Sequence, residues 1–253
     1  MGVVDGKIVL VTGGGSGMGA AGADIFAREG AAHVYVVDVN AEGGERVAGG
    51  VRGAGASATF VPTDVTDEGD VAALVDRIVA EQGRLDCAWN NAGITDAAAP
   101  FTDLTREAWE RMIAVNLTSV FLCMKHELRH MSAQGHGAIV NTSSGAGLVA
   151  APFLPHYTAA KHGVLGLTKA AAQEYNGAGI RVNAVCPGMT DTPMIQSWFA
   201  SSPGIAQAVL ATMPGQRLGR PEQVAEAAVW LCGDAADWVS GLSMVVDGGA
   251  VNR

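Results

Sequence analysis

Short apolar runs alternate with longer segments of helical periodicity from one end of the chain to the other. The apolar runs predict seven strands, at residues 7–12, 33–38, 58–62, 85–90, 138–143, 180–184 and 242–246. Most of these runs are continuously apolar, as at residues 8–11, which is typical of strands covered on both faces of a parallel sheet. The periodic segments predict helices at residues 17–29, 41–52, 67–82, 104–132, 157–176 and 221–232.

This alternation predicts an α/β fold, a doubly wound parallel sheet of about seven strands with helices on both faces. The sequence has neither an evident linker nor a long internal repeat, so we expect a single domain over residues 1–253. Residues 188–220 interrupt the alternation with prolines and with Trp198 and Phe199. A long segment of this kind outside a sheet is often a lid, and we expect a substrate lid there.

The chain is acidic, since its 253 residues include 25 aspartates and glutamates against 16 lysines and arginines, a formal net charge of −9. This balance argues against a nucleic acid or an anionic membrane as a partner. No apolar run approaches the ~18 residues of a membrane-spanning helix. The four cysteines are far apart and form no Cys-x-x-Cys pair, which indicates reduced thiols and predicts a cytoplasmic protein.

The first predicted strand leads into the first predicted helix through a glycine-rich turn, residues 13–19, with the sequence GGGSGMG. Glycines let the backbone approach a pyrophosphate, and the helix N-terminus offers it free N–H groups. Asp38 ends the second strand, where a carboxylate accepts hydrogen bonds from both ribose hydroxyls of an adenosine. That carboxylate would repel a 2′-phosphate, and no lysine or arginine stands at position 16, 39 or 40. The sequence therefore predicts NAD rather than NADP as the cofactor.

A phenol and an ammonium lie four residues apart, at Tyr157 and Lys161, near the start of a predicted helix. This spacing places both side chains on one face of the helix. A free phenol has a pKa of about 10, and an ammonium within ~4–5 Å would lower that pKa by about 2 to 3. We therefore expect Tyr157 to give and take a proton near neutral pH.

Together with further motifs, these residues resemble the short-chain dehydrogenase/reductase family over nearly the whole chain. The further motifs are Asp64-Val65, Asn90-Asn91-Ala92-Gly93, Asn116, Ser143-Ser144, Pro187-Gly188 and Thr192. The resemblance implies a Rossmann-type fold and an NAD(H)-dependent oxidoreductase that interconverts a secondary alcohol and a ketone. It also implies a homotetramer, with the helices at 104–132 and 157–176 in one interface and the C-terminal strand in another.

The resemblance implies a proton relay of four residues. Ser144 would hold the substrate oxygen, whereas Ser143 would be structural. Tyr157 would be the general acid and base, and Lys161 would bind the nicotinamide ribose and lower the pKa of Tyr157. Asn116 would anchor a water at a bend in its helix.

Cofactor positions follow from the same motifs. Asp64 and Val65 would meet the adenine, Asn90, Ala92 and Gly93 would line the ribose side, and Thr192 would contact the carboxamide. The full implied set is Gly13, Ser16, Gly17, Met18, Gly19, Asp38, Asp64, Val65, Asn91, Ala92, Gly93, Tyr157, Lys161, Pro187, Gly188, Thr190 and Thr192. Thr190 departs from the family, which often carries Ile or Val there, but this contact usually runs through the backbone.

A second motif points to different chemistry. Residues 126–130 read HELRH, the zinc-binding pattern H-E-x-x-H of metalloproteases, with His136 at the spacing of a third ligand. Ala133 replaces the glycine that turns the chain toward that ligand, and the motif lies in a helix that the fold already needs. We therefore expect no metal, and we expect His126 and His130 in a solvated or interface region beside an apolar stripe of Leu117, Phe121, Met124, Leu128 and Met131.

The segments near the expected site are apolar. The residues expected to form the substrate pocket are Val149, Ala150, Phe153, Leu154, Met194, Ile195, Trp198, Phe199, Val209 and Leu210. They favour an apolar or cyclic substrate, and His156 could face either that substrate or solvent. Two alternatives stay open: a 3-oxoacyl-thioester reductase, against which Asp38 argues, and a non-catalytic dinucleotide-binding sensor, which would not need the proton relay.

Overall fold

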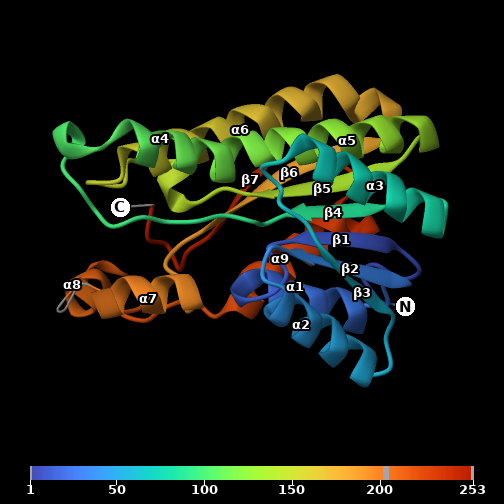
Figure 1. The fold of residues 1–253 in the computed structure, drawn as a ribbon, viewed down its shortest axis with the longest axis horizontal. Helices are drawn as coiled ribbons and strands as arrows, with labels where there is room; N and C mark the ends of the chain where they lie inside the picture. The colour runs from blue at the N-terminus through green and yellow to red at the C-terminus, as the bar shows by residue number, and fades with distance from the viewer. Residues whose placement is uncertain (1, 202–204, 252–253) are drawn as a thin grey trace.

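Seven strands form one parallel sheet in the order β3-β2-β1-β4-β5-β6-β7 (Figure 1). The computed structural model describes residues 2–201 and 205–251. The strands are β1 (Ile8–Thr12), β2 (His33–Asp38), β3 (Ala58–Pro62), β4 (Cys87–Asn90), β5 (Gly137–Thr142), β6 (Ile180–Pro187) and β7 (Ser243–Val246). All seven predicted strands are present, and β6 runs three residues beyond the predicted end at position 184. The predicted fold class is confirmed.

Helices cover both faces of the sheet (Figure 1). The helices α1 (Gly17–Arg28), α2 (Ala41–Gly53) and α9 (Pro221–Cys232) pack on one face, around a core that includes Phe26 and Trp89. The helices α3 (Glu68–Gln82), α5 (Ser119–Gln134) and α6 (Pro155–Tyr175) pack on the other, around a core that includes Leu10 and Ile139. Apolar strands therefore have both faces buried, as their sequences predict.

The helix predicted at 104–132 is two helices. A π-helical turn, Ala114–Thr118, separates α4 (Arg106–Ile113) from α5. Its Asn116 is fully buried: the side-chain oxygen accepts from the backbone N–H of Ile94 at 3.1 Å, and the amide donates to the Ile94 carbonyl at 3.0 Å. Such bulges cluster at functional sites because they redirect side chains. Phe121, expected in the buried stripe of this helix, is 48% exposed.

Two short helices, α7 (Pro193–Ser201) and α8 (Ile205–Thr212), lie outside the sheet, beyond the carboxyl end of β6 (Figure 1). They occupy the segment 188–220, whose residues 202–204 lie outside the described part of the chain. The crossovers from β1 and from β4 run in opposite directions along the sheet, so the carboxyl ends of these two strands form the crevice where ligands bind in such folds. Within the described residues, none of the helices is long and apolar enough to span a membrane.

Candidate functional site

The turn between β1 and α1 has the conformation that its glycines allow. Gly13 and Gly17 have φ angles of 63° and 51°, in the left-handed region that favours glycine. A Cβ on Gly13 would lie 2.8 Å from the Cα of Ala92, so the turn approaches the end of β4 too closely for any other residue. The backbone N–H of Asn91 donates to Thr12 Oγ1 at 3.0 Å and holds the two strand ends together. The N-terminus of α1 therefore faces the crevice.

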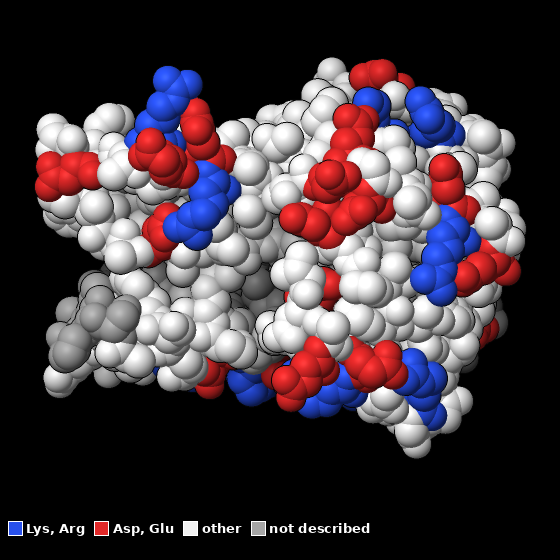
Figure 2. Space-filling model, viewed as in Figure 1, with Lys and Arg blue, Asp and Glu red and all other residues white. Residues whose placement is uncertain are grey.

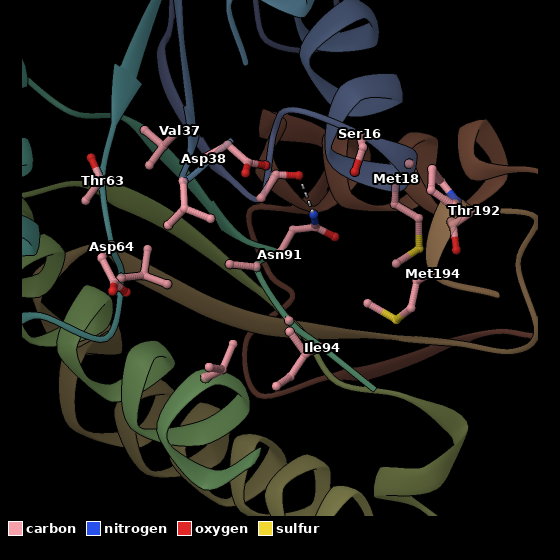
Figure 3. A pocket seen from close by; sticks show the side chains of 18 of the residues that line it. Ser16, Met18, Val37, Asp38, Thr63, Asp64, Asn91, Ile94, Thr192 and Met194 are labelled. Atoms are coloured by element: carbon pink, nitrogen blue, oxygen red, sulfur yellow. Dashed lines mark hydrogen bonds between the residues drawn. The ribbon is translucent and has the colours of Figure 1, made fainter. Parts of the chain in front are cut away.

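A cleft of about 450 Å³ opens at this crevice. It contains most of the predicted cofactor positions, namely Gly13, Ser16, Gly17, Met18, Asp38, Asp64, Val65, Asn91, Ala92, Gly93 and Thr192. Figure 3 shows Asp38 and Asp64 toward one end of the cleft and Met18, Thr192 and Met194 toward the other. The close-packed turn, the open helix N-terminus and the carboxylate at the far end fit a dinucleotide.

Two predicted cofactor positions, Gly19 and Asn90, line neither this cleft nor the smaller one that continues from it. Gly19 packs against the turn instead, since a Cβ there would lie 2.1 Å from the carbonyl oxygen of Gly13. Asn90 was expected on the ribose side, but it is buried, and its amide donates to Glu127 at 3.0 Å and to Asn141 at 3.1 Å. Because successive residues at a strand end point to opposite faces, Asn91 faces the cleft and Asn90 faces α5.

Both carboxylates of the cleft are held by backbone N–H groups. Asp38 accepts from Gly15 and from Asn40, each at 2.9 Å, so its position is fixed before any ligand binds. Asp64 accepts from the backbone and hydroxyl of Thr66 at 2.9 and 2.7 Å, and these bonds lower the pKa of its carboxyl. Arg46 of α2 donates to the Gly15 carbonyl at 3.1 Å. It brings a cation to the same turn, although positions 16, 39 and 40 carry no lysine or arginine.

A smaller cleft of about 80 Å³ continues from the first. It brings together the four predicted relay residues, Asn116, Ser144, Tyr157 and Lys161, with Pro187, Gly188 and Thr190. Lys161 is 3% exposed, and its ammonium donates to the carbonyl of Thr142 at 2.9 Å. Ser143 also lines this cleft, and its hydroxyl donates to the backbone carbonyl of Lys161 at 2.8 Å.

The protonation of this pair differs from the prediction. Burial raises the pKa of Tyr157 above its usual value, and a hydrogen bond with Ser144 opposes that rise only in part. Burial also lowers the pKa of Lys161 to about 8. The ammonium lies 5.7 Å from the centre of the Tyr157 ring. Burial therefore shifts the pKa of Tyr157 in the direction opposite to the one expected from Lys161, because a low-dielectric environment disfavours the charged phenolate.

A third cavity, of about 300 Å³, borders the relay at Ser144 and Tyr157. Its apolar lining includes seven of the residues expected there, Val149, Ala150, Leu154, Met194, Ile195, Trp198 and Val209. Phe153, Phe199 and Leu210 are not part of the lining, and Phe153 is 61% exposed. The hollowed face between α4 and α7 carries few charged side chains in its depth (Figure 2).

The H-E-x-x-H segment does not converge on a common point. His126 and His130 of α5 face α3, where they contact Glu68 at 3.4 Å and Asp76 at 2.7 Å. Glu127 faces the sheet instead: it is fully buried, and its carboxyl group accepts from Asn90 of β4 at 3.0 Å. His126 is only 8% exposed and contacts Glu68 of α3, so of the two expected surroundings, solvent or an interface, it does not lie in solvent. Among residues 2–201 and 205–251, no cluster of three or more His, Cys, Asp or Glu side chains could hold a metal ion.

Sequence reasoning missed several residues of the clefts. The unpredicted members of the larger cleft are Val37, Val39, Thr63, Thr66, Ile94, Val115 and Pro193, and Met194, expected in the substrate pocket, lines this cleft as well. Most of them directly adjoin a predicted position at a strand end, so a wider window around each motif would have found them. The position of His156 also differs from both alternatives that the sequence left open. It is 1% exposed, so it does not face solvent, and it is not part of the lining of the apolar cavity.

Known proteins match this chain over almost its full length. The sequence family described as Enoyl-(Acyl carrier protein) reductase matches residues 13–251. A cis-4-hydroxycyclohexanecarboxylate dehydrogenase of Sinomonas cyclohexanicum is 51% identical over 244 residues, 96% of each chain. A cyclohexanol dehydrogenase of Acinetobacter sp. (strain SE19) is 40% identical over 247 residues, 98% of this chain and 96% of that protein. The crystal structure of a levodione reductase, 36% identical, superposes with a TM-score of 0.94 over 98% of both chains. The chain belongs to the short-chain dehydrogenase/reductase family.

Proposed function

We propose that the protein is an NAD-dependent dehydrogenase that interconverts a cyclic secondary alcohol and its ketone. The observation that carries this proposal is the position of Tyr157, which lines both the relay cleft and the apolar cavity. The relay cleft in turn shares Asn91, Gly93 and Thr192 with the dinucleotide cleft. A substrate oxygen at Tyr157 therefore lies between a dinucleotide and an apolar chamber, as carbonyl reduction requires.

The chain's own residues would hold the substrate oxygen and move its proton. The cofactor supplies or accepts the hydride when it is bound. Ser144 would donate a hydrogen bond to the substrate oxygen, and Tyr157 would give or take the proton at that oxygen. The ammonium of Lys161 would stabilise the phenolate once water is excluded from the cleft. Asn116 holds the loop after β4 in place through its two bonds to Ile94.

Asp38 supports NAD over NADP. Both of its oxygens are fixed by backbone N–H groups at the adenosine end of the cleft. A 2′-phosphate at ~4 Å from this carboxylate would cost about 4 kcal/mol for each pair of like charges at an effective dielectric of 20. We expect NADH to bind more tightly than NADPH in calorimetry, and Asp38→Asn to narrow the gap because Arg46 stays beside the turn. Tighter binding of NADPH to the wild type would contradict this choice.

The apolar cavity supports a cyclic substrate. Its volume of about 300 Å³ exceeds the ~150 Å³ of an apolar protein cavity that holds benzene. Relatives named for cyclohexanol and cyclopentanol share 40% and 42% of their aligned residues with this chain. Ile195 and Trp198 of α7 line the cavity, and we take the segment 188–220 as its lid.

Turnover of a substrate panel tests the proposal. Purified protein with NAD⁺ would be offered cyclohexanol, cyclopentanol and 2-butanol, and separately a 3-oxoacyl thioester with NADH or NADPH. We expect the cyclic alcohols to have the highest kcat/KM. Turnover of the thioester alone would favour the reductase, and binding of the dinucleotide without any turnover would favour the sensor.

We place the protein in the cytoplasm as a homotetramer. Its four cysteines are free and buried, which supports a reducing compartment. Trp109 on α4 and Phe121 on α5 are 41% and 48% exposed, and Trp238 just before β7 is 94% exposed. Exposed aromatic side chains on two separate surfaces support two kinds of subunit contact. Light scattering of the wild type, with Phe121→Asp and Trp238→Asp as single variants, tests this assembly.

A further inference from the structure

Three charged or titratable side chains from different segments meet behind the catalytic tyrosine. Asp96, in the loop that follows β4, lies 2.5 Å from the guanidinium of Arg111 on α4. Its other oxygen lies 3.4 Å from Nε2 of His156, in the first turn of α6. His156 is 1% exposed and its Nδ1 has no hydrogen-bond partner among the described residues. Asp96 is therefore the group to which the other two converge.

These side chains lie where two loops meet. We call residues 94–100 the β4 loop and residues 148–154 the β5 loop. The backbone N–H of Ala99 in the first donates to the carbonyl of Phe153 in the second at 3.0 Å. Phe153 has a φ angle of 65°, a conformation that is strained for a non-glycine residue and persists only where neighbouring contacts impose it. The β5 loop is thus held in a strained form against the β4 loop.

Both loops line the cavity proposed for the substrate. The β4 loop contributes Thr95, the neighbour of Asp96, and the β5 loop contributes Val149, Ala150 and Leu154. Asp96 itself borders a hollow on the outer side, between Thr95 and the lid residue Trp198. A change in how Asp96 is held would therefore move the cavity wall without touching the relay cleft, of which Asp96 is not a part.

We propose that Asp96 is a positioning residue that clasps the β4 loop to α4 and to the first turn of α6, directly after the β5 loop, through Arg111 and His156, and thereby sets the size of the ring that the cavity accepts. The specificity half of this proposal rests on the proposed function, whereas the clasp itself does not. The carboxylate joins the loop to two helices. Asp96 thus holds two partners, a guanidinium through a charge-assisted bond and an imidazole.

Asp96→Asn and Asp96→Ala test the clasp by two measurements. The first is backbone amide exchange of the two loops, followed by mass spectrometry. We expect exchange in residues 148–154 to become about tenfold faster, the effect of losing one hydrogen bond to a charged group. The second is steady-state kinetics, in which we expect KM for cyclohexanol to rise about tenfold while kcat changes by less than about threefold and KM for 2-butanol changes little.

Matched variants separate the clasp from general effects. Asp103→Asn removes an exposed aspartate just beyond the β4 loop, Arg106→Met an exposed arginine of α4 and His162→Gln an exposed histidine of α6. These controls should leave exchange and KM unchanged, whereas Arg111→Met and His156→Gln should behave like Asp96→Asn.

Two results would overturn the proposal. If residues 148–154 exchanged at the wild-type rate in both Asp96 variants, the proposed clasp would be refuted, even if KM changed. Faster exchange with unchanged KM would remove its role in specificity. A wild type that turns over no cyclic alcohol would instead defeat the proposed function, and the exchange experiment would still decide the clasp.

Discussion

Two neighbouring helices each contain a buried side chain whose pKa is strongly shifted, Lys161 on α6 and Glu127 on α5. Lys161 is 3% exposed and Glu127 is completely buried. Burial moves both pKa values to about 8, from below for the glutamate and from above for the lysine. The direction follows from one cause, since a low-dielectric environment favours the neutral form of either group.

The surroundings of the two side chains differ. Lys161 borders the relay cleft beside Ser144 and Tyr157, so a ligand can reach it. Glu127 has one hydrogen-bond partner, Asn90, and its Oε1 has none among the described residues. The comparison teaches that a shifted pKa marks burial, and that access to a cleft separates a reactive group from a core group.

The largest difference is expected from Lys161→Met. Loss of the ammonium should lower kcat/KM for the alcohol by at least about 100-fold, the usual contribution of a group that supports proton transfer. Lys169→Met, an exposed lysine on the same helix, serves as the control and should leave kcat/KM unchanged. If kcat/KM fell by less than about threefold in Lys161→Met, Lys161 would be a structural residue like Glu127 rather than a group that supports proton transfer.

Glu127→Gln should affect stability and leave catalysis unchanged. The folded chain binds a proton at Glu127 that the unfolded chain releases at neutral pH, so the carboxyl destabilises the native state there. We expect the free energy of unfolding in urea at pH 7 to rise by about 3 kcal/mol in the variant. Glu110→Gln, an exposed residue of α4, should change it by less than about 0.5 kcal/mol.

The pH dependence of the same difference sharpens the comparison. Because the pKa of Glu127 is raised to about 8 from an unfolded value of 4.5, the wild type should lose stability relative to Glu127→Gln as pH rises between these values. Below about pH 4.5 and above about pH 8, the difference in the free energy of unfolding between the two proteins should no longer change with pH. A gap that is flat from pH 5 to 8 would show that Glu127 is ionised in the native state.

The smallest effect is expected at the histidines that flank Glu127. His126→Gln and His130→Gln remove two members of the zinc-like motif, but each of these side chains bonds to an acidic residue of α3. We expect kcat/KM to change by less than about twofold and chelator treatment to leave it unchanged. Stoichiometric zinc in elemental analysis, lost in these variants, would reverse this conclusion.

The dinucleotide half of the site could be predicted from the sequence because its residues adjoin strand ends. Buried parallel strands read as continuous apolar runs, and the glycine turn follows the first of them directly. Asp38 is then located by the end of β2. Each inference needed only local pattern and the rule that carboxyl ends of parallel strands share one edge.

The substrate half could not be predicted to the same depth. The π-helical turn at Asn116 depends on tertiary bonds to Ile94, which no periodicity reveals. The burial of His156 and the exposure of Phe153 depend on how two loops pack, and the raised pKa of Tyr157 depends on that burial. These features are properties of the assembled chain, so sequence spacing alone gave the wrong sign for the pKa.

Single-turnover kinetics of Tyr157→Phe with NAD⁺ and cyclohexanol tests the central claim most directly. The substitution removes only the phenolic oxygen from a half-buried ring, so dinucleotide binding and the unfolding midpoint should be retained. We expect the rate of ketone formation to fall by about 100-fold to 10,000-fold, the range for loss of a general acid and base. A rate within about threefold of the wild type, with the dinucleotide bound, would contradict the assignment of proton transfer to Tyr157.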